Sequence, residues 1–383
     1  MAFSALLSIA SRVAGGSWGV AVPQGMPASA IARGIPRTFG TVSWPGMPRL
    51  QHKPPLLLWC QRSAISNVPN PRRGKIATCR PASHSVTRQA SFVRSSQAMA
   101  AAGEAPGEGV TFVETEAATR RNADSGMVAF VTGANRGIGM EVTRQLLAKT
   151  KGTVVAACRD PSSAADLRAL GEMDGNQTRL DVVKMDIEDQ ASLDTAAEHV
   201  KSTYGRVDLL FNVAGVLGDG KNTPGPERSL RAMDREWLRH TLEVNTIGPM
   251  MLVAALAPLL ESPAKKGDDG ARPPSVVVNF SARVGSIGDN GMGGWHSYRM
   301  SKTALNMATK GISIELRRRR VWAFSYHPGT TDTGLSEPFQ ANVKPEKLFT
   351  TDYTVSQVLG IVDSMTEELS GGFYAFDGSR IVW

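Results

Sequence analysis

Short apolar runs alternate with amphipathic helical segments along the chain from residue 126 onward. The apolar runs have the length of strands, and the amphipathic segments repeat their apolar positions with the period of an α-helix. Runs that are apolar at nearly every position are typical of parallel strands covered on both faces. The pattern therefore predicts an α/β fold over 126–383, a single Rossmann-like doubly wound parallel sheet with helices on both faces. We expect strands at 127–133, 152–159, 178–187, 207–215, 275–282 and 321–329, a last strand or turn at 371–379, and helices at 137–150, 161–171, 189–205, 236–262 and 297–318.

The first hundred residues differ in charge from the rest. Residues 1–103 contain 12 Lys and Arg and no Asp or Glu, whereas the remaining residues contain 31 basic and 35 acidic side chains. An Arg- and Ser-rich segment without acids is typical of an organelle transit peptide. We expect 1–103 to be a disordered leader, with the chloroplast (plastid stroma) favoured over the mitochondrion, and 104–125 to be a linker. The alternative is a basic tail that binds RNA.

Neither a membrane span nor a metal site is expected. No apolar run approaches the roughly 18 residues that a transmembrane helix needs. Cys60 and Cys79 fall in the leader, so Cys158 is the single thiol of the predicted domain, and no Cys/His cluster has metal-site spacing.

A glycine-rich turn, "TGANRGIG" at 132–139, lies between the first expected strand and the first expected helix. Gly133 permits a tight turn, Gly137 lets a pyrophosphate approach the backbone, and Gly139 lets the helix pack closely on the strand. The free N–H groups of the helix start then face the phosphates. The turn therefore predicts a dinucleotide site, with further contacts expected from Asn135, Arg136 and Ile138.

The end of the second expected strand bears on which dinucleotide binds. An acid at this point usually holds the ribose hydroxyls of NAD. Here Arg159 comes first and Asp160 follows, and Arg136 lies in the glycine turn. Two guanidiniums near the ribose favour NADP(H) over NAD(H), unless Arg159 points outward and Asp160 takes the hydroxyls. Further cofactor contacts are expected at the ends of the third and fourth strands, from Asp186, Ile187, Asn212, Ala214 and Gly215.

Tyr298 and Lys302 stand four residues apart in an expected helix, so they share one face. A tyrosine with a pKa near 10 is a poor proton donor at neutral pH. A neighbouring ammonium stabilises the phenolate and lowers that pKa. Together with the glycine turn, the pair predicts an acid/base centre at which Tyr298 protonates a carbonyl oxygen while hydride reaches the carbon.

The motifs "TGANRGIG", "NVAG", "EVNTIGP", "SYRMSK" and "HPG" follow in this order, and together they resemble the short-chain dehydrogenase/reductase family. The stretches "NFSARVGSIGDNGMGGWHSYRMSKTALN" and "GGFYAFDGSRIVW" resemble its C-factor/sniffer-like carbonyl reductase branch. The resemblance implies that Tyr298 is the general acid/base and Lys302 its tuner. It further implies that Asn245 holds a water linking Lys302 to solvent, and that the loop at Pro328, Gly329 and Thr331 meets the cofactor's carboxamide.

One position departs from the pattern of the family. Its catalytic serine stands three residues after the Asn of the fifth strand, and counting from Asn279 this position is Ala282. Ser281 is one residue early, which on a regular strand faces the other way. A local bulge could turn Ser281 inward, Ser286 could substitute, or Tyr298 could hold the substrate oxygen alone. We expect Ser281 to be the catalytic serine.

These features predict an NADP(H)-dependent oxidoreductase that reduces a small aldehyde or ketone. The displaced serine leaves one alternative, a cofactor-binding regulatory or signalling protein with weak or no turnover. Segment 330–355 is expected to cover the substrate, with apolar contacts from Leu335, Phe339 and Phe349. No nucleic acid or membrane partner is expected for the domain. The resemblance implies a homodimer or homotetramer formed through helices 236–260 and 297–318, where Ala304, Ala308 and Gly311 permit close packing.

Overall fold

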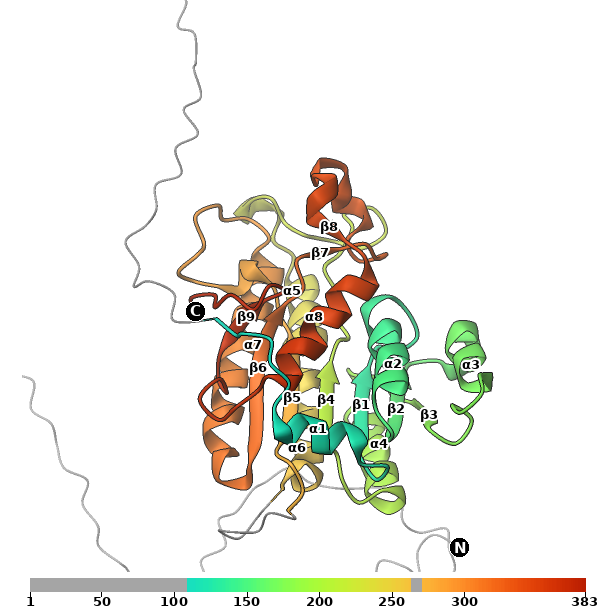
Figure 1. Cartoon of the computed structure of the whole chain (residues 1–383). Helices are drawn as coiled ribbons and strands as arrows, with labels where there is room; N and C mark the ends of the chain where they lie inside the picture. The colour runs from blue at the N-terminus through green and yellow to red at the C-terminus, as the bar shows by residue number, and fades with distance from the viewer. Residues whose placement is uncertain (1–108, 263–270) are drawn as a thin grey trace, which may run out of the picture. The chain divides into compact units, whose positions relative to one another are not determined.

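The structure, a computed structural model, describes residues 109–262 and 271–383 (Figure 1). The expected leader at 1–103 lies outside the described residues. Seven parallel strands form one sheet in the order β3-β2-β1-β4-β5-β6-β9. The predicted doubly wound sheet is therefore confirmed, and its strand order reverses between β1 and β4, where such sheets bind ligands. The strands are β1 Val128–Thr132, β2 Thr153–Cys158, β3 Leu180–Lys184, β4 Leu209–Asn212, β5 Ser275–Phe280, β6 Val321–His327 and β9 Phe373–Ala375.

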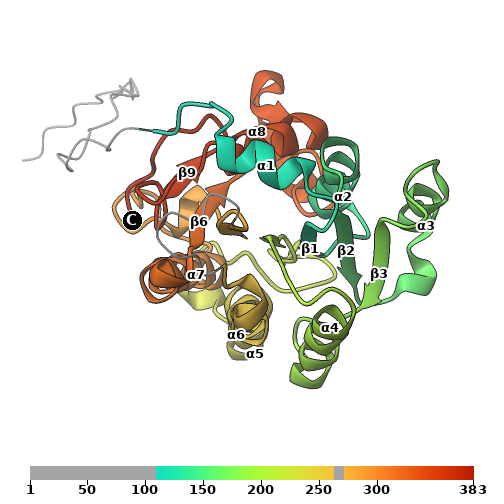
Figure 2. The same ribbon diagram turned by 60° about the horizontal axis from the view of Figure 1, so that its bottom comes forward.

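Helices cover both faces of the sheet (Figure 2). On one face lie α1 Glu116–Ala123, α2 Gly137–Lys149 and α8 Thr351–Asp363. The other face is covered by α4 Gln190–Thr203, α6 Gly248–Leu260 and α7 His296–Glu315. The short helices η1 Pro161–Ser163 and α3 Ala165–Glu172 follow β2 at the β3 edge of the sheet.

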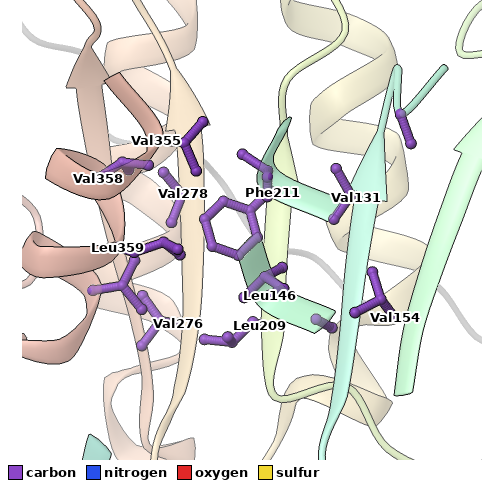
Figure 3. Packing of buried hydrophobic residues seen from close by; sticks show 14 of the residues in the cluster. Val131, Leu146, Val154, Leu209, Phe211, Val276, Val278, Val355, Val358 and Leu359 are labelled. Atoms are coloured by element: carbon purple, nitrogen blue, oxygen red, sulfur yellow. The ribbon is translucent and has the colours of Figure 1, made fainter. Parts of the chain in front are cut away.

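Alternate residues of each strand enter the two cores, as the pleat of a strand requires. Val131 of β1 belongs to the same buried cluster as Leu146 of α2 and Val355 of α8 (Figure 3), whereas its neighbour Phe130 belongs to the cluster on the other face, with Leu193 of α4. Because both faces are buried, the central strands are largely apolar, which explains the continuous apolar runs in the sequence, whereas the edge strand β3 is only partly buried and carries Asp181 and Lys184.

The long helix expected at 236–262 is divided by a π-helical turn. Helix α5 (Arg235–Leu242) continues through η3 (Glu243–Ile247) into α6. Single π-helical turns occur frequently at functional sites. The combined helix of 26 residues is long and apolar enough to cross a membrane, but 44% of its most apolar window is buried inside the fold. The core helix of a globular domain has the same properties, so a single such helix is weak evidence for a membrane span.

The segment expected to be a linker, 104–125, contains helix α1, which packs across α8 (Figure 1). Arg121 of α1 is buried, and its Nη2 lies 2.7 Å from Oδ1 of Asp363 at the end of α8; Lys149 pairs with the same carboxylate. The backbone N–H of Val110 donates to the carbonyl of Gly378 at 2.7 Å. From Val110 onward this segment is part of the domain. The linker prediction is wrong there because the partners of α1 lie more than two hundred residues away in sequence.

The segment after β6 lies above the carboxyl ends of the strands (Figure 1). It forms two short paired strands, β7 Thr330–Thr331 and β8 Leu348–Phe349, with the 3₁₀ helices η6 (Glu337–Asn342) and η7 (Pro345–Lys347) between them. The segment therefore borders the carboxyl edge of the sheet, where the ligand site is expected.

Candidate active site

The glycine turn between β1 and α2 has the backbone that a dinucleotide needs. Gly133 (φ 64°) and Gly137 (φ 55°) adopt left-handed conformations that favour glycine. A Cβ on Gly139 would lie 2.3 Å from the carbonyl oxygen of Gly133, so a side chain would force α2 away from β1. Helix α2 starts without a side-chain cap, because the N-cap residue Arg136 makes no such bond. Its first N–H groups are thus available to a phosphate, and the turn fits a bound dinucleotide.

The end of β4 closes against this turn. The backbone N–H groups of Val213 and Ala214 both donate to Thr132 Oγ1 at 3.0 Å. A Cβ on Gly215 would lie 3.1 Å from Asn245 Oδ1 and 3.7 Å from Lys302 Nζ. The chain can pass this close to the predicted catalytic residues only because Gly215 has no side chain. The structure therefore brings the glycine turn, the β4 end and Lys302 next to one another.

Asn212, expected near the cofactor ribose, instead directs its side chain into the core beneath α7. Its Nδ2 donates to Asn279 Oδ1 at 2.8 Å, and Asn279 Nδ2 donates to Thr309 Oγ1 at 2.8 Å. Ser325 of β6 donates to the same hydroxyl at 3.0 Å. These four residues form a buried polar row across three strands. The row stabilises the sheet under the site, and Asn212 can meet a cofactor only through its backbone.

The two residues at the end of β2, Arg159 and Asp160, differ in their contacts. Asp160 caps η1, where its Oδ1 accepts hydrogen bonds from the N–H of Ser162 at 3.0 Å and from its hydroxyl at 2.5 Å. Arg159 and Arg136 are exposed, and within the described residues neither guanidinium makes an ion pair or a hydrogen bond. One carboxylate oxygen of Asp160 is thus engaged in η1, and the guanidiniums of Arg136 and Arg159 are both exposed near the turn.

The residues that follow β3 form a tight local turn. Asp186 Oδ1 accepts from the N–H of Glu188 at 3.1 Å, and the N–H of Asp186 donates to Ser192 Oγ at 2.9 Å. The carbonyl of Ile187 packs so closely on Gly248 that a Cβ there would lie 2.3 Å away. Asp186 keeps its second oxygen for a ligand, while Ile187 joins this turn to α6.

Tyr298 and Lys302 lie together on the first turns of α7. Lys302 is only 4% exposed, and its Nζ donates to the carbonyl of Phe280 at 2.8 Å and lies 5.7 Å from the centre of the Tyr298 ring. Burial lowers the pKa of Lys302 to about 7. Burial also raises the pKa of the Tyr298 hydroxyl well above its usual value. Desolvation thus opposes the expected lowering of the tyrosine pKa, since burial disfavours the charged form of both groups.

Asn245 lies in the π-helical turn and is fully buried. Its Nδ2 donates to the carbonyl of Val216 at 2.8 Å and to Ser301 Oγ at 3.0 Å, and its Oδ1 accepts from the N–H of Val216 at 2.8 Å. The side chain therefore holds the chain after β4 against α7, beside Lys302. The water that Asn245 is expected to hold stays a prediction.

Ser281 directly follows β5, and its side chain faces α7. Ser281 continues the ladder between β5 and β6, because its N–H donates to the carbonyl of Tyr326 at 2.8 Å, so no bulge turns it. Its hydroxyl donates to Asn306 Oδ1 of α7 at 2.6 Å. Ser286 is also buried, and its Oγ accepts from the N–H of Asp289 at 3.0 Å. The expectation that Ser281 turns into the site is therefore not supported by its geometry, and both hydroxyls already have partners.

The loop after β6 reaches the glycine turn through a residue that the sequence reasoning missed. A Cβ on Gly137 would lie 3.4 Å from Thr333 Cγ2. Thr331, the expected contact, is buried and bonds Thr354 Oγ1 at 2.8 Å. Gly329 takes φ 71°, and a Cβ there would lie 2.5 Å from the Phe349 ring, while Pro328 precedes it. Thr333 rather than the Thr331 side chain therefore lies over the turn; no pattern in the sequence distinguished the two.

His327 at the end of β6 was also not singled out. Its Nδ1 is buried and has no hydrogen-bond partner in the described part of the chain. Burial lowers the pKa of His327 to about 4, so the ring is neutral near pH 7.

Comparison with known proteins agrees with this geometry. The family model described as short chain dehydrogenase matches residues 127–344, more than half of the chain. The chain belongs to the short-chain dehydrogenase family. A relative of this short-chain dehydrogenase in Rhodococcus, 1-hydroxy-2-glutathionyl-2-methyl-3-butene dehydrogenase, is 31% identical over 66% of this chain and 98% of its own length. The C-signal protein of Myxococcus xanthus is 30% identical over 47% of this chain and 94% of its own.

The solved structures to which the chain is similar include carbonyl reductases. The NADPH-bound carbonyl reductase from chicken fatty liver has 29% identity and a TM-score of 0.58, covering 67% of this chain and 98% of its own. The carbonyl reductase Sniffer of Drosophila melanogaster has 26% identity and a TM-score of 0.57, covering 68% and 100%. The resemblance to the C-factor/sniffer-like branch is thereby confirmed.

Proposed function

We propose that this short-chain dehydrogenase is an NADP(H)-dependent reductase of small aldehydes or ketones. The observation that carries the proposal is the position of Tyr298 and Lys302, which lie side by side at the carboxyl edge of the sheet, next to Gly215 and the glycine turn. This edge, at the reversal of strand order, is where open parallel sheets bind their ligands. The carbonyl reductases among the structural neighbours support the same reaction class.

NADP(H) is the cofactor that the described residues fit best. One carboxylate oxygen of Asp160 is engaged in η1, whereas the guanidiniums of Arg159 and Arg136 are exposed and make no ion pair within the described residues. Guanidinium groups bind phosphate oxygens in a planar two-point geometry, which suits a ribose 2′-phosphate. The chicken liver neighbour was solved with NADPH, which supports this choice.

When bound, the nicotinamide supplies the hydride. Tyr298 would donate its hydroxyl proton to the carbonyl oxygen as that oxygen gains charge. Lys302, when protonated, would stabilise the phenolate left on Tyr298, since an opposite charge within a few ångströms favours the charged form. Asn245 would hold the chain after β4 in place, so that Lys302 keeps its position beneath the ring.

A cofactor-binding regulatory protein with weak turnover is the second candidate. Ala282 at the family's serine position favours it, because the Ser281 hydroxyl donates to Asn306 instead and the Ser286 hydroxyl accepts from the N–H of Asp289. A lost hydroxyl donor near a developing oxyanion costs about 10²–10³ in kcat in other enzymes, which slows turnover without abolishing it. The reductase proposal therefore remains the stronger of the two.

The deciding experiment measures NADPH oxidation by the full chain against a panel of aldehydes, ketones and quinones. Tyr298→Phe should lose activity at least a hundredfold, because it lacks the proton donor. The matched control is Tyr204→Phe, which removes a hydroxyl bonded to Asp181 outside the site and should retain activity. NADH should be used less efficiently than NADPH. Bound NADPH without turnover in either protein would favour the regulatory candidate, and equal rates for Tyr298→Phe and the parent would refute the role of Tyr298.

We also propose that the protein forms a homodimer or homotetramer through α6 and α7. Apolar side chains are exposed along these helices, and a Cβ on Gly311 would meet no atom within 4 Å. Such residues are typical of a surface that another subunit covers. The exposed apolar residues of the two helices are Met250, Met251, Met300, Met307 and Ile314.

A further inference from the structure

Trp295 has an unusual backbone directly before the catalytic helix. It is the N-cap residue of α7, three positions before Tyr298, and adopts the left-handed region with φ 52° and ψ 40°. Among the described residues only Arg320 shares a positive φ without being glycine. A bulky side chain at positive φ is strained, and such strain persists only where the surrounding structure holds it. The backbone of Trp295 therefore needs contacts that hold it in this conformation.

Glu227 supplies those contacts from the loop after β4. Its backbone carbonyl accepts from the N–H of Trp295 at 2.5 Å. Its buried carboxylate accepts from the N–H of Ser297 at 3.1 Å and from the Ser297 hydroxyl. Helix α7 has no side-chain cap of its own, so this carboxylate serves as its cap, where a negative charge also favours the helix dipole. Glu227 thus fixes the turn from which Trp295 projects.

The Trp295 ring connects the catalytic tyrosine to the segment after β6. Its centre lies 6.4 Å from that of Tyr298, at 70° to it, and 5.3 Å from that of Phe339 in η6, at 53°. All three rings are half-buried, so each keeps surface that a ligand can contact. The edge-on and tilted arrangements are those that aromatic rings prefer. Trp295 and Phe339 therefore form an apolar wall beside Tyr298.

Two arginines that follow or precede Trp295 in sequence are engaged with protein partners. Arg299 donates to the carbonyls of Gly294 at 2.9 Å and Val284 at 3.1 Å. Arg283 pairs with Asp289 at 3.0 Å. A substrate group that lies against the wall thus meets flat apolar surface first. An aromatic ring next to the carbonyl fits such a surface better than a short alkyl chain.

We propose that Trp295 is a specificity-determining residue that contacts the substrate group attached to the carbonyl, and that Glu227 is its positioning residue. The inference rests on the proposed reductase function. The preference of the enzyme for aromatic over aliphatic carbonyls is thereby assigned to the Trp295 ring. The buried carboxylate of Glu227 holds the turn that positions this ring.

The test compares kcat/KM for 4-nitrobenzaldehyde and butanal with NADPH as reductant. The parent should prefer the aromatic aldehyde, and Trp295→Ala should lower this preference about tenfold, the upper range of an aromatic pair. Trp295→Gly removes the ring and relieves the left-handed strain, so an equal loss in both variants assigns the effect to the ring. Phe339→Leu should lower the preference in the same direction through the other half of the wall.

Glu227→Gln tests the positioning role. It keeps the size of the side chain but weakens the cap on α7, so the preference for the aromatic aldehyde should fall while butanal turnover changes less. A merely structural role would lower both rates equally, and this result would overturn the assignment of Glu227. An unchanged preference in both Trp295 variants would overturn the assignment of Trp295. Turnover by the parent protein would still support the proposed reductase function. If the parent protein reduces neither of these aldehydes nor any other carbonyl, the proposed reductase function and the assignment of Trp295 are both refuted.

Discussion

Lys302→Met should make the stability of the protein less dependent on pH. Burial lowers the pKa of Lys302 from its ordinary value of 10.5 to about 7. Below pH 7 the folded protein must keep an ammonium in its interior, at a cost of roughly 4–5 kcal/mol, since each pKa unit corresponds to about 1.4 kcal/mol. Methionine fills similar space without a charge, so the variant should be the more stable protein at pH 6.

The direction of the pH effect follows from where the protons are bound. Between pH 7 and 10.5 the unfolded chain keeps the Lys302 proton while the folded protein has lost it, so stability rises with pH in this window. The stability advantage of the methionine variant should therefore shrink by about 2–3 kcal/mol between pH 7 and pH 9. Above pH 10 the raised pKa of Tyr298 adds an opposing effect, so measurements stop at pH 9.

Urea unfolding of both proteins at pH 6, 7, 8 and 9 gives the required differences. Taking the difference cancels the other titrating groups, which the two proteins share. Lys310→Met, at an exposed lysine further along the same helix, is the matched control and should show no such trend. A constant difference between the parent and Lys302→Met from pH 6 to pH 9 would refute the reasoning, because it would mean that Lys302 titrates alike in the folded and unfolded chains.

Two further variants test contacts described above. Ser281→Ala should cost about 1–3 kcal/mol of stability through the lost bond to Asn306 and leave kcat within a few-fold, as urea unfolding and steady-state kinetics would measure. A hundredfold loss in kcat at unchanged stability would instead restore Ser281 as the catalytic serine. Asp363→Ala should cost about 3–5 kcal/mol, because it leaves the buried guanidinium of Arg121 without its partner. Asp352→Ala, at an exposed carboxylate of the same helix, should cost under about 1 kcal/mol. Equal losses in both variants would refute a stabilising role of the buried Arg121–Asp363 ion pair.

The sheet could be predicted because its signal is local. Most strands are apolar runs bounded by turn residues, and the glycines at 133, 137 and 139 stand where their backbone roles require them. Tyr298 and Lys302 were predictable as a pair because four residues of helix bring them to one face. In all these cases the cause and its effect lie within about fifteen residues.

The remaining features depend on contacts that are distant in sequence. The π-helical turn at Asn245 is maintained by bonds to Val216 and Ser301. Helix α1 needs Asp363 at the other end of the domain. The direction of the Ser281 hydroxyl depends on Asn306, and counting positions from Asn279 could not reveal that partner. The wall at Trp295 likewise joins two loops that sequence patterns describe separately.

The buried polar row at Asn212, Asn279, Thr309 and Ser325 specifies the register of the strands in the sheet. Sliding β5 by two residues against β4 would return valines to apolar positions, so hydrophobic burial alone would tolerate the slip. The slip would separate the two amides, however, and leave several polar groups unpaired in the interior. The β4 end follows β4 and contacts Thr132 at the glycine turn, while α7 follows β5. A sheet held in one alignment therefore keeps the cofactor turn and Tyr298 at a constant separation.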